Sequence, residues 1–131
     1  MFLPVVLSAS WLPSAYAQDS FGAKDQASIE AVESLNAAAA YKTGDYEAAR
    51  SGWLALADKG NTSAMINLAN LYEQGQGVTQ DFPEAIQWLE KAAVLGDSRA
   101  QFELGMAHEK GIVVDRDPQA AAGWFRKAAE Q

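Results

Sequence analysis

Residues 64–96 read AMINLANLYEQGQGVTQDFPEAIQWLEKAAVLG, and residues 100–131 read AQFELGMAHEKGIVVDRDPQAAAGWFRKAAEQ. The two stretches share identical residues at a constant offset of 36 positions. The matching pairs are Ala64 and Ala100, Leu68 and Leu104, Gly75 and Gly111, Val78 and Val114, Asp81 and Asp117, Ala85 and Ala121, Trp88 and Trp124, and Lys91-Ala92-Ala93 with Lys127-Ala128-Ala129. The same step links Asp45, Ala49 and Gly60 to the middle stretch. A period of 20 to 50 residues indicates a solenoid or a repeat array.

Each repeat unit has the pattern of two helices joined by a glycine loop. Met65, Leu68 and Tyr72 recur at i, i+3 and i+7, which places them on one face of a helix. Gly75 then ends this helix, because glycine reaches left-handed backbone conformations at little steric cost. The second helix begins at Asp81, which is a favourable N-cap residue, as is Asp117 before Pro118. Its predicted buried stripe consists of Ala85, Trp88, Leu89 and Ala92.

The first unit differs in its turn, where residues 41–45 connect its helices without the longer glycine loop. Residues 27–41 supply its first helix and include a run of four alanines, the residue with the highest helix propensity. The sequence therefore predicts an all-α fold, an α-α superhelix (solenoid) of about three antiparallel helix pairs. The expected repeat domain is 27–131, with units of about 27–60, 61–96 and 97–131.

The composition predicts a folded chain that does not bind nucleic acid. Hydrophobic residues make up 49% and charged residues 21% of the 131 residues, which is typical of a globular domain. The formal charge of -7 disfavours contact with phosphate backbones or anionic lipids, so a protein or peptide partner is the expectation. Cysteine is absent, which leaves no disulfide framework and no thiolate chemistry.

The N-terminus has the pattern of an export signal. Met1 to Leu12 is apolar and uncharged, and Ala15 and Ala17 form an A-x-A cleavage signature. A buried N-terminal element is the alternative, but Pro4 and Pro13 fit it poorly. We therefore expect a signal peptide at 1–17, cleaved near Ala17, a flexible segment at 18–26, and a periplasmic or secreted location in a bacterium. The apolar stretch is shorter than the about 20 residues needed to span a bilayer, so we expect no membrane insertion of the mature chain.

The repeat resembles the Sel-one-like repeats, relatives of the tetratricopeptide repeats. The resemblance lies in Ala64-x-x-x-Leu68-x-x-x-Tyr72-x-x-Gly75-x-Gly77 and in Asp81-x-x-x-Ala85-x-x-Trp88-x-x-Lys91-Ala92-Ala93. The last unit departs from it at His108, where the pattern has tyrosine, and at Val113, where it has the second glycine. Because Val113 stands in place of this glycine, the pattern does not predict the path of the last loop. The first unit looks more like a tetratricopeptide hairpin.

This resemblance implies a superhelix whose first helices line a concave groove, and a role as an adaptor or scaffold that binds another protein. Stacked helix pairs suit this role independently, because they leave a long groove for a peptide or a partner helix. Matching to the tetratricopeptide pattern gives eight partner-binding candidates: Ser63, Ile66, Asn70, Glu73, Arg99, Phe102, Met106 and Glu109. For Phe102 and Met106, packing against a neighbouring helix is the alternative interpretation.

The sequence offers little for catalysis, so we expect a protein that is not an enzyme and has no metal site and no cofactor. His108 is the single histidine, and it occupies the repeat position of Tyr72, which favours a structural role. Asp115 and Asp117 lack the spaced ligands of a calcium loop. The alternative function is a cell-wall-related or β-lactam-binding hydrolase, an activity associated with cysteine-rich members of the family that the chain resembles.

A third interpretation is that the chain is a fragment of a longer solenoid. Terminal repeats need a polar outer face, and no polar capping helix follows the last unit. We therefore expect either self-association through the C-terminal helix pair or a further extension of the solenoid.

Overall fold

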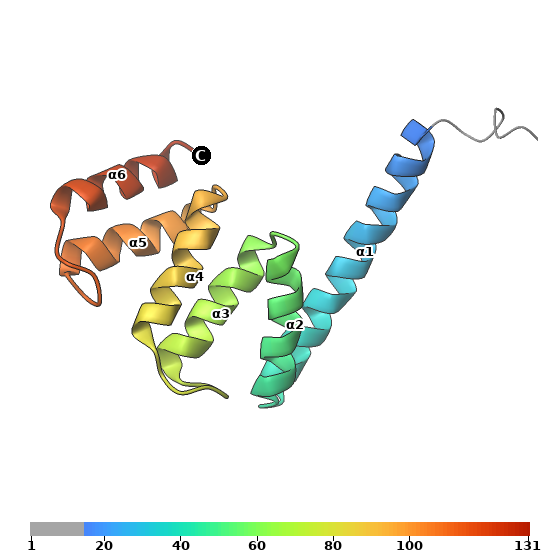
Figure 1. Cartoon of the computed structure of the whole chain (residues 1–131), viewed down its shortest axis with the longest axis horizontal. Coiled ribbons are helices and arrows are strands. Elements are labelled where there is room, and N and C mark those ends of the chain that lie inside the picture. The colour runs from blue at the N-terminus through green and yellow to red at the C-terminus, as the bar shows by residue number, and fades with distance from the viewer. Residues whose placement is uncertain (1–14) are drawn as a thin grey trace, which may run out of the picture. The chain divides into compact units, whose positions relative to one another are not determined.

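The computed structural model describes the backbone of residues 15–131 and the side chains of residues 22–131. Within that range it contains six helices and no strand, which confirms the all-α repeat architecture (Figure 1). They are α1 (Ala15–Lys42), α2 (Tyr46–Asp58), α3 (Thr62–Gln74), α4 (Phe82–Val94), α5 (Ser98–Lys110) and α6 (Pro118–Ala129).

The chain divides within α1 into two units, residues 1–32 and residues 33–131. In the first unit, α1 begins at Ala15, so residues 18–26 are helical here and not the flexible segment that we expected. Most of the predicted signal peptide, residues 1–14, lies outside the described residues. The second unit holds the end of α1 and the helices α2 to α6.

The five later helices begin at capping residues that recur with the repeat. Asp45, Asp81 and Asp117 each accept a hydrogen bond from the backbone N–H three residues later, at 3.1, 3.0 and 3.0 Å. Asn61 and Asp97 do the same for the first helices of the second and third pairs, at 2.9 and 3.1 Å. These bonds satisfy N–H groups that have no partner inside the helix. The N-caps predicted at Asp81 and Asp117 are confirmed.

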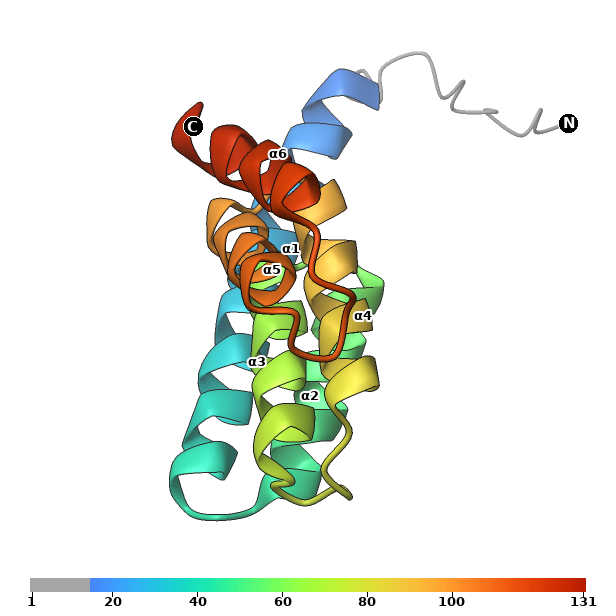
Figure 2. The same ribbon diagram turned by 90° about the vertical axis from the view of Figure 1, so that its left-hand side faces the viewer.

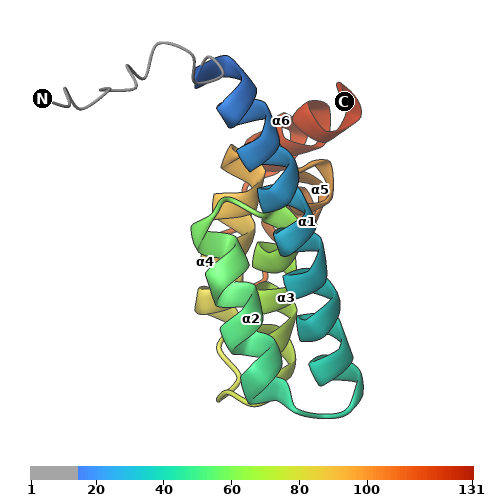
Figure 3. The ribbon, with the colours of Figure 1, turned by 90° about the vertical axis from the view of Figure 1, so that its right-hand side faces the viewer.

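The core of the second unit is built from leucines and alanines. Leu56, Leu68, Leu71 and Leu104 are fully buried, and small alanines between them let the helices approach closely. The first pair adds an aromatic cluster, in which the Tyr41 ring lies 5.4 Å from Tyr46 and 5.6 Å from Trp53. Figure 3 shows α2 running back along the end of α1, from which Tyr41 reaches this cluster.

The two repeat tryptophans are half-buried, so Trp88 lies at the edge of the core and not fully within the buried stripe that we predicted. Trp88 and Trp124 pack on the edge of the core, and each is covered by the lysine three residues later. The Nζ atoms of Lys91 and Lys127 lie 4.0 and 4.7 Å from the respective ring centroids. These are cation–π contacts, repeated with the period of the chain.

The two long loops follow the same path. The Asp81 N–H donates to the Tyr72 carbonyl at 2.9 Å, and one repeat later the Asp117 N–H donates to the His108 carbonyl at 3.0 Å. Val113 therefore keeps the repeat's loop. It does so with a φ of 70°, a left-handed conformation that a β-branched residue rarely adopts.

Successive pairs pack side by side and turn relative to one another. Helix α3 packs against both α2 and α4, and the α5–α6 pair is turned across them (Figures 1 and 2). One hollow lies between the second and third pairs, and another lies on the outer side of the third pair.

Candidate protein-interaction groove

The first hollow is a pocket of about 310 Å³ between the second and third helix pairs, which we call the groove pocket. Helices α3, α4 and α5 and the α5–α6 loop form its walls. It is lined by Asn70, Glu73, Phe82, Ala85, Ile86, Leu89, Glu103, Met106, Ala107, Lys110, Ile112 and Val113. The first helices of both repeats contribute, as the resemblance implied, and α4 lies between them.

The structure brings three of the eight predicted residues together in this pocket. Asn70 and Glu73 reach it from α3 and Met106 reaches it from α5. Ser63 and Glu109 are exposed and do not line it. Partner binding at these positions stays a prediction, and most of the pocket lining lies outside the predicted set.

The prediction for Ile66 was wrong, because its side chain is buried, with an exposed fraction of 3%. It belongs to the hydrophobic core rather than to a contact surface. Helix α3 packs against both α2 and α4, so a residue that points away from the Leu68 stripe still meets a neighbouring helix. Ile66 is therefore unavailable to a partner.

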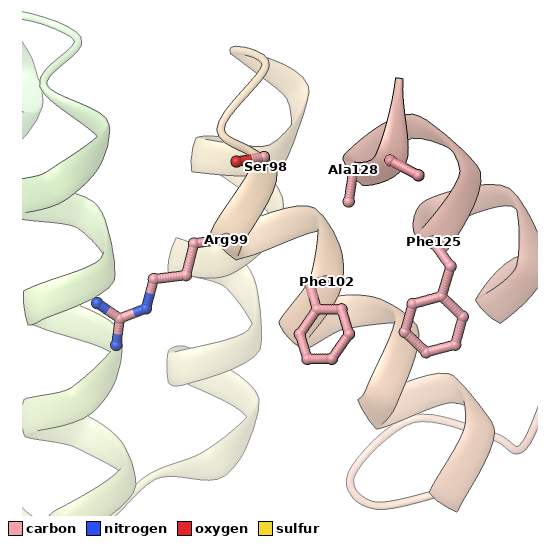
Figure 4. Close-up of a pocket in the computed structure, with 6 residues that line it drawn as sticks. Ser98, Arg99, Phe102, Phe125 and Ala128 are labelled. Atoms are coloured by element: carbon pink, nitrogen blue, oxygen red, sulfur yellow. The ribbon is translucent and has the colours of Figure 1, made fainter. Parts of the chain in front are cut away.

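Arg99 and Phe102 line a different hollow, which we call the end face. It has a volume of about 610 Å³ and lies on the outer side of α5 and α6, lined by Ser98, Arg99, Phe102, Phe125, Ala128 and Ala129 (Figure 4). The rings of Phe102 and Phe125 lie 5.5 Å apart and are tilted by 50°. Phe125 packs closely on Gly105, where an added Cβ would come within 2.5 Å of its ring.

Sequence reasoning missed the apolar rim of the groove pocket. Phe82, Ile112 and Val113 are exposed large hydrophobic residues, and all three line the pocket. A signal was present in the repeat alignment, because Ile112 and Val113 replace Gln76 and Gly77 of the preceding unit. Two polar or small positions thus become apolar side chains at the mouth of the pocket.

A comparison with the preceding loop explains the shape of this rim. At Gly77 an added Cβ would lie 2.5 Å from the Cβ of Tyr46, so that loop rests directly on α2. Phe82 and Val113 stand at the same two repeat positions and carry full side chains. The pair cannot come as close as Gly77 and Tyr46, because the valine side chain occupies the space that glycine leaves.

The histidine sits where the repeat places an aromatic residue. His108 is half-buried, and its backbone carbonyl accepts the bond that the Tyr72 carbonyl accepts one repeat earlier. Its Nδ1 atom is buried and has no hydrogen-bond partner among the described residues. In the same part of the chain, no three acidic, histidine or cysteine side chains gather as a metal would require. None of the helices over residues 15–131 is both long and apolar enough to cross a membrane.

Known proteins with this repeat are similar to the chain in sequence and in fold. A Sel1 repeat protein from Oxalobacter formigenes is 37% identical, with a TM-score of 0.68 over 75% of this chain and 40% of its own. A protective antigen of uropathogenic Escherichia coli strains, which displays an SLR fold, is 32% identical, with a TM-score of 0.69 over 88% of this chain and 26% of its own. The chain thus spans less than half of either structure.

The family model agrees with the repeat boundaries. No curated protein matches the chain. The model of the Sel1 repeat matches residues 62–97 and 98–131, within one residue of the units that the 36-residue offset defines. The two matches cover more than half of the chain, and the chain therefore belongs to the Sel1 repeat family.

Proposed function

We propose that this chain is an exported protein–protein interaction module, an adaptor or scaffold that holds a partner protein or peptide in the groove pocket. The observation that carries the proposal is the exposed apolar rim of Phe82, Ile112 and Val113 around that pocket. Exposed apolar residues that gather around a hollow are typical of a contact surface, whereas scattered ones are not.

The lining suits the side chains of a peptide. Leu89 and Met106 supply an apolar floor, and the flexible thioether adapts to different shapes. Asn70 can both donate to and accept from a peptide backbone, and Glu73 and Lys110 offer charges at the edge. A volume of about 310 Å³ is at the small end of ligand pockets, which fits one or two anchoring side chains.

The backbone at Val113 supports a functional interpretation of the rim. A non-glycine residue at positive φ costs on the order of 1 to 3 kcal/mol, and glycine would avoid that cost. The valine instead places an exposed apolar side chain at the mouth of the pocket. Strain of this kind clusters at binding sites because the site needs the side chain that causes it.

The polar side chains of the groove pocket suit the binding of a peptide. Its polar lining consists of Asn70, Glu73, Glu103 and Lys110, and Glu103 pairs with Arg99 at 3.0 Å. The lining contains no serine, threonine, cysteine or histidine. Binding is the activity that this arrangement supports.

Export rests on the leader pattern of residues 1–17. We expect the protein to be recovered from the periplasmic or secreted fraction of a bacterial host with Gln18 as its first residue. Edman sequencing of the protein from that fraction measures this directly. A chain that stays in the cytoplasm and retains its first seventeen residues contradicts the export part of the proposal and leaves the groove part standing.

The groove is tested by site-specific photo-crosslinking in the native host. A benzophenone amino acid at position 106 should capture a discrete partner, and the same group at Ser51, an exposed residue of α2 outside the groove pocket, should not. Asn70→Ala should reduce the capture at position 106. Equal capture at positions 106 and 51 would overturn the groove as the binding surface.

A further inference from the structure

The interface between the first and second helix pairs, which we call the first interface, is filled by aromatic side chains of the chain itself. The Tyr41 ring lies 5.4 Å from the Tyr46 ring and 5.6 Å from the Trp53 ring. The Tyr41 hydroxyl donates to the Gln76 side-chain oxygen at 2.9 Å. The loop at Gly77 lies directly on Tyr46. Tyr41 is therefore the ring at the centre of a closed cluster.

The counterparts of this cluster all line the groove pocket. One repeat later, Tyr46, Trp53, Gln76 and Gly77 become Phe82, Leu89, Ile112 and Val113. The first loop is shorter than the second, so the counterpart of Tyr41 is found from the ends of the helices. Tyr41 is the last residue but one of α1, and Glu73 is the last but one of α3. The groove pocket is thus the same arrangement without its central ring.

Two substitutions along the repeat remove ring volume from the groove pocket. The exposed carboxylate of Glu73 stands in place of the Tyr41 ring, and the smaller Leu89 stands in place of the Trp53 indole. A space of about 310 Å³ is present where these rings have no counterpart. Protein interiors are close-packed, so a matching side chain from a partner gains many contacts in such a space.

The remaining walls of the pocket suit an aromatic ring that has no hydroxyl. Phe82 stands where Tyr46 contacts Tyr41 and offers its own ring for a tilted aromatic contact. Met106 offers a sulfur atom, which packs favourably against a ring. Ile112 replaces the amide that accepts the Tyr41 hydroxyl, so a phenol would find no side-chain acceptor at this point. The pocket therefore favours phenylalanine over tyrosine.

The charges around the pocket are complementary to a peptide with charges of opposite sign on its two sides. Glu73 belongs to α3 and Lys110 to α5, so they stand on different walls. The two ion pairs in the described part of the chain involve neither of them. The third charged residue of the lining, Glu103, pairs with Arg99 at 3.0 Å. Complementary charges at the edge of a contact fix its orientation.

We propose that the groove pocket binds a phenylalanine side chain of a partner peptide, whose ring takes the place that Tyr41 holds in the first interface. The peptide carries a basic residue on its Glu73 side and an acidic residue on its Lys110 side. This inference rests on the proposed function, since it names the segment that the groove pocket holds. The partner supplies the ring that the second helix pair lacks.

NMR titration of the full chain with acetylated, amidated pentapeptides tests this anchor. The probes are Lys-Gly-Phe-Gly-Glu and its reverse, which cover both chain directions. One of them should shift the Phe82 and Met106 amide signals and bind roughly threefold to tenfold more tightly than its tyrosine version. Ile112→Gln restores the acceptor of the first interface and should abolish this preference. Ile112→Val is the matched control, because it stays apolar and should keep the preference.

Substitutions at Glu73 test the place of the ring and the charge beside it. Glu73→Tyr puts a ring of the chain itself at the Tyr41 position and should remove peptide binding. Glu90→Tyr is the control, because Glu90 is also exposed and does not line the groove pocket. Circular dichroism should show an unchanged helix content for both. Glu73→Gln should weaken binding of the charged peptide and leave binding of Gly-Gly-Phe-Gly-Gly unchanged.

Several results would overturn the proposal. They are the absence of any shift with either charged peptide, equal binding of the phenylalanine and tyrosine versions, and undiminished binding of the charged peptide by Glu73→Tyr or Glu73→Gln. Crosslinking at position 106 reports the groove function separately, because it captures a partner whatever its anchoring side chain. A discrete partner captured there without selective binding of phenylalanine would leave the proposed function standing and remove this inference alone.

Discussion

Val113 and Gly77 adopt the same left-handed backbone conformation one repeat apart, with φ angles of 70° and 68°. Glycine adopts this conformation without strain because it has no Cβ atom, whereas valine is strained in it. The loop geometry is nevertheless kept, because the bonds from Asp117 to His108 and from the Arg116 side chain to the Glu109 carbonyl repeat those of the preceding loop. These hydrogen bonds across the loop therefore override the backbone preference of the valine itself.

Val113→Gly should stabilise the protein by about 1 kcal/mol. Relief of left-handed strain is worth roughly 1 to 2 kcal/mol, and the greater freedom of glycine in the unfolded chain offsets part of it. Urea denaturation followed by circular dichroism measures the change. Ile112→Gly is the control, since Ile112 does not have a positive φ and should gain nothing. The Val113→Gly variant should also weaken capture at position 106, because it removes part of the rim. A destabilised Val113→Gly protein would contradict the assignment of strain.

Gly77→Ala should destabilise the protein more than Gly60→Ala does. Both glycines have positive φ, so both substitutions carry a backbone cost on the order of 1 kcal/mol. At Gly60 an added Cβ meets nothing within 4 Å, whereas at Gly77 it would lie 2.5 Å from the Tyr46 Cβ. Overpacking adds about 1 to 3 kcal/mol. Thermal unfolding of both variants gives the difference, and equal losses would show that the loop can move away from α2.

The elements of this fold could be predicted from sequence because their signals are local. Asp81 and Asp117 are capping residues whose side chains bond within three positions, and Gly75 ends its helix through its own backbone. The 36-residue offset then let each unit support the prediction for the next. Residues 18–26 carried no such signal, because they show no apolar periodicity, and their helix continues that of the alanine-rich segment.

The surfaces could not be predicted in the same way, because exposure depends on what covers a residue. Ile66 and Phe102 occupy one repeat position and differ from 3% to 53% in exposed fraction. The tetratricopeptide pattern placed both in the groove. Stacking of the third helix pair on the second decides which residues are covered, and the pattern of a single repeat unit does not contain this contact.

Ile66→Ala and Phe102→Ala should therefore have different effects on stability. Truncating the buried isoleucine should cost about 2 to 5 kcal/mol, from lost burial and the cavity that remains. Truncating the half-exposed phenylalanine should cost about 1 kcal/mol, because it keeps much of its contact with water in the folded chain. Chemical denaturation at low protein concentration compares them without a contribution from association. Equal costs would place Phe102 in the core.

His108→Tyr tests whether the imidazole has any role beyond filling its repeat position. Tyr72 is accommodated at the same position one repeat earlier, and the substitution removes a buried Nδ1 atom that has no partner among the described residues. An unsatisfied buried polar atom costs about 1 to 3 kcal/mol, so the variant should be at least as stable as the unaltered protein. Capture of a partner at position 106 should also be unchanged. His108→Ala is the comparison and should lose stability, because it empties the aromatic position. If the tyrosine variant folds with full stability and yet loses partner capture, the histidine takes part in recognition, and its similarity to Tyr72 is structural only.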